Sequence, residues 1–301
     1  MKRVVSVSLG SSKRDHQAIA EFGGHTFSIE RIGTDGDKAK AIQLIRELDG
    51  KVDAFGMGGT DLYIYAGNKR YTFKESAEIA AAARYTPIVD GSGVKNTLER
   101  RVVQHLAEKE GILFKNQQVL VVCAVDRFGL AEELIAAGSQ AVFGDLLFGL
   151  GLPIPIRSLG TLAMLARVVA PVITRLPIKM FYPTGENQMK NVPRFSQYFQ
   201  QAKIIAGDFH FIRRNMPEKL TGKLIIANTV TKQDEELLKE RGVKILVTTT
   251  PEIGGRSLGT NVLEAILVTL LGKKPEEITP YDYGRILKEL DIMPRIKRFS
   301  D

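Results

Sequence analysis

The sequence is poor in the residues that build disulfides and metal centres. It has a single cysteine, Cys123, and four histidines among 301 residues. One cysteine excludes an intramolecular disulfide and a cysteine-based metal cluster, and no spacing of histidines and carboxylates indicates a metal site. Because Cys123 stands inside an apolar run, we expect a buried, unreactive thiol rather than a nucleophile.

Long apolar runs are also missing. The most apolar region, roughly residues 146–182, contains Arg157, Arg167 and Arg175 and several prolines. It therefore has no span of about 20 apolar residues that could form a membrane helix. The chain runs directly into a strand-like segment at residues 3–9, so no N-terminal signal is expected. These features predict a soluble cytoplasmic protein without a membrane partner.

The charge distribution disfavours a nucleic-acid partner. The net charge is +8, but the basic residues are interleaved with acidic ones, and the only dense basic stretch is PRIKRFSD at residues 294–301. Nucleic-acid-binding domains gather their lysines and arginines on one face or along one helix. Attraction of a carboxylate or a phosphorylated ligand explains the positive charge more economically.

Strand-like runs alternate with helical patterns in the first part of the chain, which indicates parallel βαβ units. Hydrophobic residues make up 44% of the sequence, enough to bury a core. Segment 62–73 has alternating aromatic arms around Gly67-Asn68 and predicts a β-hairpin that projects from the sheet edge. The strands are expected at 3–9, 25–33, 52–58 and 86–91, and the helices near 36–48, 75–84 and 94–110.

The second half reads as a doubly wound domain, because its strand-like runs are almost continuously apolar. Two helices, at 261–272 and 278–290, close the chain and can pack on either domain. We therefore predict an α/β fold with an N-terminal α/β domain (1–115) and a Rossmann-like parallel-sheet domain (116–301). The six strand-like runs are 119–125, 140–148, 179–183, 203–209, 223–230 and 244–250.

Residues 119–145 have the order of a dinucleotide-binding unit: strand, turn, helix, second strand and terminal acid. The three positions that need small residues carry Ala124, Asp126 and Gly129. The Asp126 carboxylate would repel a diphosphate, although Arg127 can offset its charge, and Asp145 stands where a ribose-binding acid is expected. The alternative is a plain α/β turn with Asp126 as helix N-cap and Asp145 as a strand-end acid. Both interpretations stay open.

A second candidate site follows the first strand-like run. Backbone amides, hydroxyls and cations meet there before a helix is expected to start, which favours an anion or carboxylate ligand over a capped, solvated turn. The spacing is not that of a Walker A loop. The residues of this candidate anion site are Gly10, Ser11, Ser12, Lys13 and Arg14.

Further strand ends carry polar residues that can meet at one edge of a parallel sheet. In the first half, Asp61 or Asp90 paired with Lys95 can transfer a proton, although each alone is also a common turn or cap residue. In the second half, His210 is a candidate acid or base, with a structural histidine as the alternative. The remaining candidates are Asn228, Thr229, Thr248, Thr249 and Thr250 for a cofactor, and Gly255 and Arg256 for an anion.

Three segments carry a resemblance to a known family: residues 31–64, TPIVDGSGVKNTLERRVV at 86–103, and residues 227–265. The chain resembles a bacterial family labelled quinate 5-dehydrogenase-like. This resemblance implies a two-domain α/β fold and NAD(P)-linked oxidation of a cyclic polyol acid. The glycine-rich turn and the lysine motif of shikimate and quinate dehydrogenases have no counterpart here, so no catalytic residue is carried over.

The leading hypothesis is an oxidoreductase that binds NAD or NADP on the second domain and a small anionic polyol or hydroxy acid in an interdomain cleft. Lys13, Arg14 and Arg256 would hold the anion, and Lys95 or His210 would move the proton. One alternative is a non-catalytic binding or regulatory protein with a degenerate Rossmann domain. Another is an isomerase or transferase of a phosphorylated metabolite. A homodimer is the general expectation.

Overall fold

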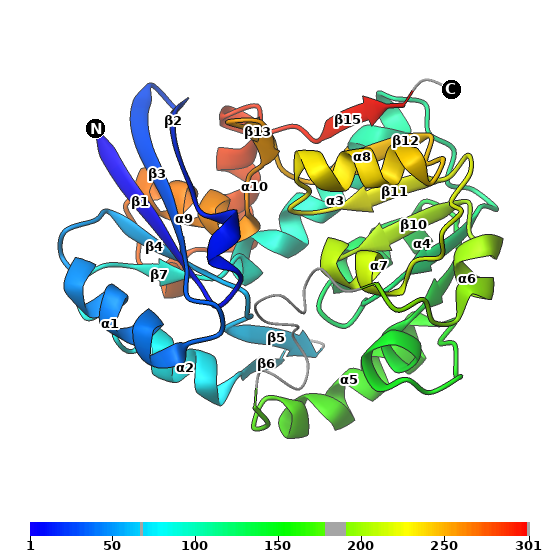
Figure 1. The fold of residues 1–301 in the computed structure, drawn as a ribbon, viewed down its shortest axis with the longest axis horizontal. Helices are drawn as coiled ribbons and strands as arrows, with labels where there is room; N and C mark the ends of the chain where they lie inside the picture. Colours follow the sequence, from blue (N-terminus) through cyan, green and yellow to red (C-terminus); the bar gives the residue numbers. More distant parts are fainter. Residues whose placement is uncertain (67–68, 178–190, 300–301) are drawn as a thin grey trace.

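Two separate β-sheets organise the chain (Figure 1). The computed structural model describes residues 1–66, 69–177 and 191–299. The first sheet has five strands in the order β2-β3-β1-β4-β7, and the second has six in the order β15-β12-β11-β10-β8-β9. Most neighbouring strands are parallel, so the predicted α/β class with parallel sheets is confirmed.

The first sheet is built around β1, whose valines point to both faces. Val4 packs into the core on one face, and Val5 and Val7 pack into the core on the other. Its strands are β1 (Lys2–Ser8), β2 (His16–Phe22), β3 (His25–Gly33), β4 (Ala54–Gly58) and β7 (Ile88–Val89). The helices between them are α1 (Lys38–Leu48) and α2 (Lys74–Ala80), and α3 (Ser92–Glu108) follows β7.

Strand β2 corrects the expectation of a helix after Arg14. The segment HQAIAEF alternates between more and less exposed residues, which is the period of an edge strand. It pairs antiparallel with β3 through a tight turn at Gly23 and Gly24, whose φ angles are 56° and 74°. Two consecutive positive φ angles are readily adopted by glycine, and they close a hairpin.

The second sheet carries five parallel strands and one antiparallel edge strand, β15. Sequence patterns missed β15, whose basic residues mask its strand character, and the predicted strand 179–183 lies outside the described residues. The strands are β8 (Gln118–Val121), β9 (Gln140–Phe143), β10 (Ile204–Gly207), β11 (Leu224–Ala227), β12 (Ile245–Thr248) and β15 (Arg295–Arg298). The helices are α4 (Phe128–Ala136), α5 (Leu159–Ile173), α6 (Ser196–Gln201), α7 (Phe209–Asn215) and α8 (Lys232–Glu240).

The two closing helices return to the first sheet. Helix α9 (Thr260–Leu271) is apolar on nearly all sides, and Leu263 and Ile266 pack in one core with Val4 and Phe27. Helix α10 (Pro280–Glu289) covers α9 with its apolar face. The chain then crosses back to add β15 to the second sheet. The first sheet is therefore covered on one face by the C-terminal part of the chain.

Two short hairpins complete the fold. The first, β5 (Tyr63–Ala66) and β6 (Lys69–Thr72), is the predicted hairpin, and it forms a sheet of its own. Its expected turn at residues 67–68 lies outside the described part. Ile64 of this hairpin and Phe73 beside it pack against Ala166 and Ala170 of α5, so the hairpin joins the two halves. The second hairpin, β13 (Glu252–Ile253) and β14 (Arg256–Ser257), precedes α9.

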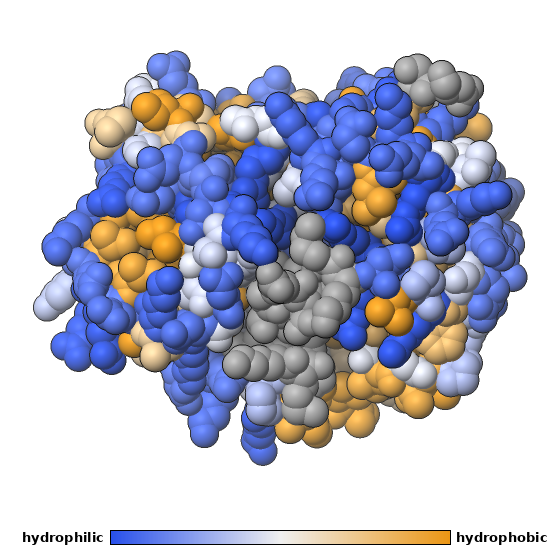
Figure 2. All heavy atoms as spheres, viewed as in Figure 1, coloured by the Kyte–Doolittle hydropathy of each residue, from blue (hydrophilic) through white to orange (hydrophobic). Residues whose placement is uncertain are grey.

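The face of the molecule seen in Figure 2 is mainly hydrophilic, and one group of apolar atoms lies along its lower edge, in the region where Figure 1 shows α5. Among the described residues, no helix combines the length and the apolar character needed to cross a bilayer.

Candidate functional site

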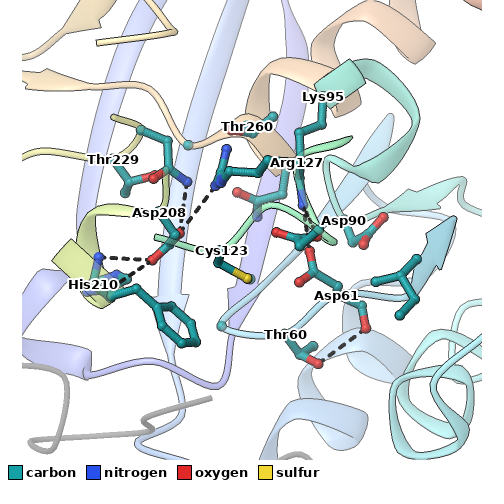
Figure 3. A pocket seen from close by; sticks show the side chains of 18 of the residues that line it. Thr60, Asp61, Asp90, Lys95, Cys123, Arg127, Asp208, His210, Thr229 and Thr260 are labelled. Atoms are coloured by element: carbon teal, nitrogen blue, oxygen red, sulfur yellow. Dashed lines mark hydrogen bonds and ion pairs between the residues drawn. The ribbon is translucent and has the colours of Figure 1, made fainter. Parts of the chain in front are cut away.

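A cleft of about 280 Å³ lies between the two sheets, at the carboxyl ends of their parallel strands (Figure 3). Loops after β4, β8, β10 and β11 contribute Asp61, Cys123, Asp208 and Thr229 to its lining. Ligands of open parallel sheets bind at this edge. The sequence-based expectation of convergent strand ends is therefore met by both sheets at once.

Three arginines from separate elements line one part of the cleft: Arg14, Arg31 and Arg256. Arg31 pairs with Asp15, at 2.7 Å between Nη1 and Oδ1. Neither Arg14 nor Arg256 forms an ion pair with any carboxylate in the described parts of the chain. The three arginines are called the arginine site below. Carboxylates therefore balance only part of the positive charge of this site.

Two histidines hold these arginines without cancelling their charge. Nη1 of Arg14 lies 2.9 Å from Nε2 of His210, and Nη1 of Arg256 lies 3.0 Å from Nδ1 of His16. Burial, followed by the charge of the adjacent arginine, lowers the pKa of each histidine to about 4. Both rings are therefore neutral at pH 7, and the bonded nitrogen accepts from the guanidinium.

The arginine site is strained electrostatically. Burial lowers the pKa of Arg31 and Arg256 to about 10, and the charge of Arg14 adds to the effect in both. Burial also lowers the pKa of Arg14, whose buried Nε has no hydrogen-bond partner among the residues that the structure describes. Because arginine keeps its proton in proteins, like charges are held together in a partly desolvated place. An anion bound among them relieves that repulsion.

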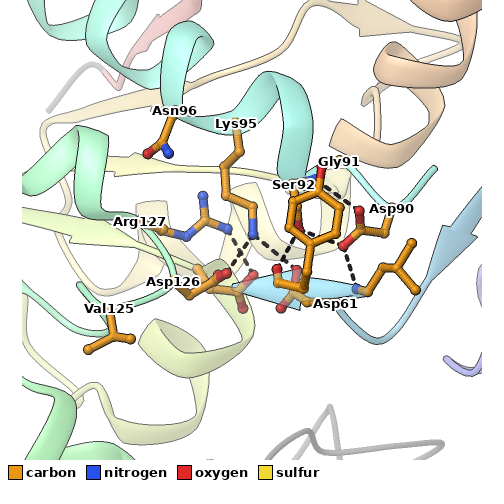
Figure 4. Close-up of polar contacts among 12 residues, drawn as sticks. Asp61, Asp90, Gly91, Ser92, Lys95, Asn96, Val125, Asp126 and Arg127 are labelled. Atoms are coloured by element: carbon orange, nitrogen blue, oxygen red, sulfur yellow. Dashed lines mark hydrogen bonds and ion pairs between the residues drawn. The ribbon is translucent and has the colours of Figure 1, made fainter. Parts of the chain in front are cut away.

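A lysine flanked by two carboxylates lies in another part of the cleft (Figure 4). Nζ of Lys95, on α3, is 3.0 Å from Oδ1 of Asp61 and 2.7 Å from Oδ1 of Asp126. Burial alone would lower the pKa of Lys95, but the charges of Asp126 and Asp61 outweigh it and raise the pKa. Lys95 is thus a permanent ammonium group, suited to donate hydrogen bonds rather than to act as a base.

Asp90 lines the cleft beside this triad but has other partners than Lys95. Its carboxylate accepts from the amide of Leu62 at 2.6 Å and from the hydroxyl of Ser92 at 2.5 Å. Behind it, Glu264 of α9 accepts from the amide of Gly91. Burial and then the charge of Asp90 raise the pKa of Glu264 to about 8. The bond between Glu264 and Gly91 anchors α9 to the start of α3. Of the two predicted partners of Lys95, Asp61 is the one that forms the ion pair, because Asp90 is bonded to Leu62 and Ser92.

In the turn between β8 and α4, the amides of Ala124, Val125 and Gly129 already donate to side chains of the protein. The amides of Ala124 and Val125 both donate to the Asp145 carboxylate, at 3.0 and 2.8 Å to Oδ1. The amide of Gly129 donates to Oδ1 of Asn96 at 2.8 Å. The predicted N-cap role of Asp126 is wrong: Arg127 is at the N-cap position, because the Asp126 carboxylate is drawn to Lys95.

These contacts test whether a nicotinamide dinucleotide fits this turn. The amides that would receive phosphate oxygens already hold a carboxylate, and Asp126 adds a second negative charge at the position of closest approach. Burial raises the pKa of Asp145 to about 6, so at pH 7 it is charged and fully engaged with these amides. The diphosphate of NAD or NADP therefore does not fit here.

The other predicted cofactor residues are divided between the cleft and the core. Asn228 and Thr229 line the cleft, and the side-chain carbonyl of Asn228 accepts from the amide of Phe209. The threonines at the end of β12 are buried and bonded within the protein. The hydroxyl of Thr248 donates to the backbone carbonyl of Thr250, and the hydroxyl of Thr250 donates to the backbone carbonyl of Leu258. Buried and outside the cleft lining are Thr248, Thr249, Thr250, Ala124 and Gly129.

Arg127 is buried and joins the two halves. Its guanidinium forms an ion pair with Glu99 of α3 and lies 3.3 Å from Oδ2 of Asp208, the N-cap residue of α7. Its charge is thus balanced inside the protein, although it borders the cleft.

The predicted anion turn after β1 contributes only its last residue. The amide of Gly10 donates to Ser8, that of Ser12 to Asp35, and that of Lys13 to Ser11. In the part of the chain that the structure describes, Arg14 lines the cleft, whereas Gly10, Ser11, Ser12 and Lys13 do not. Gly255 likewise lies outside the lining, in the turn that presents Arg256.

Sequence patterns did not single out His16 or Arg31 as site residues. Both become visible once HQAIAEF is read as a strand, because β2 and β3 then place His16 opposite Arg31. Cys123 borders the cleft, and burial raises the pKa of its thiol well above the usual value, consistent with an unreactive group. Over the described residues, no cluster of three or more histidine, cysteine or acidic side chains can hold a metal ion.

Solved structures similar to this chain share its α/β layout at low identity. A galactofuranose binding protein is 13% identical, with 97% of this chain and 99% of that chain covered and a TM-score of 0.36. The NAD-dependent malic enzyme of Thermotoga maritima is 14% identical, with 82% and 65% covered and a TM-score of 0.30. A dipicolinate synthase chain of Bacillus halodurans is 13% identical, with 90% and 98% covered and a TM-score of 0.28. These likenesses carry no functional argument.

No curated protein matches the chain. Residues 3–90 match the family model DUF8753, a domain of unknown function. Residues 93–299, more than half of the chain, match a second domain of unknown function, DUF8754. The chain therefore belongs to the DUF8754 family.

Proposed function

We propose that this protein binds a small anionic ligand in the cleft between its two sheets, with Arg14, Arg31 and Arg256 holding the anionic group. The supporting observation is the arginine site itself: over the described residues, its three guanidinium groups form an ion pair with one carboxylate, that of Asp15. Guanidinium groups bind carboxylates and phosphates through paired, charge-assisted hydrogen bonds. Neutral histidines fix two of the three arginines in place before the ligand arrives.

The lysine–carboxylate triad suits hydroxyl groups on the same ligand. Lys95 supplies N–H donors, while Asp61 and Asp126 supply acceptors. A hydroxyl group both donates and accepts, so it can bond to either type of partner. A hydroxy acid or an anionic polyol matches both parts of the cleft.

Calorimetric titration with inorganic phosphate, sulfate and a hydroxy acid such as malate tests this function. Arg14→Gln and Arg256→Gln each remove a charge-assisted contact and are expected to weaken binding about 10- to 100-fold. Arg167→Gln, an exposed substitution on α5 outside the cleft lining, is the matched control. Equal affinities in all three variants would contradict the proposed site.

The second candidate is oxidation of a hydroxy acid with NAD(P), as the resemblance to the quinate 5-dehydrogenase-like family implies. The pairing of Lys95 with Asp61 favours it, because the Asp61 carboxylate can accept the proton of a substrate hydroxyl while the ammonium group of Lys95 donates a hydrogen bond to the hydroxyl oxygen. The dinucleotide would have to lie away from the β8–α4 turn, whose amides are occupied.

Nicotinamide absorbance in the presence of quinate or shikimate and either cofactor distinguishes the two candidates. We expect no reduction of NAD⁺ or NADP⁺. Reduction by the wild type that is lost in Lys95→Gln would establish the dehydrogenase instead.

A further inference from the structure

The cleft has an apolar part that the anion-binding function leaves unused. Leu165, Val169 and Ile173 of α5 line the cleft, as do Ile64 of β5 and Phe73, the residue that follows β6. These side chains belong to the lining of the same continuous cleft as the arginine site.

The side of helix α5 that faces the cleft is apolar. Part of this apolar surface is still exposed to solvent. Ala166 and Ala170 are buried against the hairpin, whereas Leu165, Val169 and Ile173 are only partly buried. Apolar side chains left at the edge of a cavity gain stability when a ligand removes them from water.

We propose that the ligand of this cleft is amphipathic, with its anionic group at the arginine site and a hydrocarbon or aromatic portion against α5. This inference rests on the proposed anion binding and narrows it to one class of ligand. Small, fully hydrophilic anions would fill only the charged part of the cleft.

A homologous series of phosphate monoesters provides the test: inorganic phosphate and methyl, n-butyl and n-hexyl phosphate, each titrated by calorimetry. If the alkyl chain lies against α5, each added methylene is expected to tighten binding up to about fourfold, the value for complete removal from water. The gain in affinity should stop once the alkyl chain has covered the apolar side chains that line the cleft, called the apolar wall below.

Two neighbouring valines on α5 give a matched pair of variants. Val169→Ser places a hydroxyl in the apolar lining, so it is expected to reduce the gain per methylene while leaving the affinity for methyl phosphate unchanged. Val168→Ser alters a side chain that is 69% exposed and outside the lining, so it should leave both quantities unchanged. Retained methyl phosphate binding also shows that each variant is folded, and Val169→Ala serves if the serine variant is not.

The outcomes separate this inference from the function on which it rests. If methyl phosphate binds and longer chains bind no more tightly, the amphipathic ligand is overturned while the anion site stands. If hexyl phosphate binds equally well to Arg256→Gln, the apolar wall acts alone and the inference is again overturned. If inorganic phosphate and all the esters fail to bind, the anion site itself falls, and this inference with it.

Discussion

The carboxylate of Asp145 lies 3.0 Å from the amide nitrogen of Ala124, a residue 21 positions earlier in the chain. A side chain of this protein thus takes the donors that a dinucleotide-binding turn reserves for phosphate oxygens. The amides of this turn are bonded to a carboxylate that follows the neighbouring strand, β9.

Dinucleotide binding is therefore expected to be absent. Titration with NAD⁺, NADH, NADP⁺ and NADPH should show no micromolar binding by the wild type. Asp126→Gly, which restores a small residue at the position of closest approach, should not create binding, because Asp145 still holds the amides of Ala124 and Val125. Micromolar binding by either protein would refute this expectation.

Loss of the Lys95 charge is expected to destabilise the fold. Lys95→Met leaves Asp61 and Asp126 without their common partner in a buried place, which costs about 3 to 5 kcal/mol of unfolding free energy. Lys38→Met removes a lysine from a solvent-exposed pair with Glu78 and should lower the stability much less. Urea denaturation of both variants measures the difference, and similar losses in the two would argue against a special role of the buried pair.

Neutral His210 predicts a loss of stability in acid. Its pKa is about 4 in the folded protein, against about 6.5 in the unfolded chain. The unfolded chain therefore binds more protons, and stability falls as the pH drops from about 6.5 to 4. The loss attributable to this residue is about 1 to 3 kcal/mol.

The difference between wild type and His210→Gln isolates that contribution from other titrating groups. Asp145 and Glu264 have raised pKa values and act in the opposite direction over part of this range. Chemical denaturation at pH 7, 6 and 5 measures the unfolding free energy of both proteins. The difference between the two values should become smaller as the pH falls. Parallel curves would show that His210 does not titrate between the two states.

Close packing of α3 against α4 predicts a penalty for Gly129→Ala. A Cβ there would lie 2.6 Å from Oδ1 and 2.8 Å from the backbone oxygen of Asn96. Because backbone must move, we expect a loss of about 1 to 3 kcal/mol. Gly160→Ala on α5, where a Cβ would lie 4.0 Å from Oγ of Ser158, should be neutral or stabilising by up to about 1 kcal/mol in thermal unfolding. Tolerance of both substitutions would show that α3 and α4 can separate.

The sequence was sufficient to predict the parallel strands of the two sheets because these strands are apolar and regular. Runs such as KLIIANTV contain a buried strand that needs no distant partner to be recognised. Edge strands β2 and β15 were missed, since exposed edges carry polar and basic side chains that resemble loop or tail sequences.

The candidate site was harder to predict because its charges are set by tertiary neighbours. Asp126 suits a helix cap in sequence, yet Lys95 of another helix draws it away. Arg14, Arg31 and Arg256 come from three segments, and no local pattern indicates that they meet. Local sequence identified Arg14 and Arg256 as anion-binding candidates. The pairing of β2 with β3 adds Arg31.

The return of α9 to the first sheet has a consequence for the order in which the protein folds during synthesis. Val4 shares a core with Leu263, so one face of the first sheet stays open to water until the last fifth of the chain has been made. Contacts over such separations form slowly and leave apolar surface exposed meanwhile. Residues 1–115, although first to emerge, thus complete their core only when the closing helices arrive.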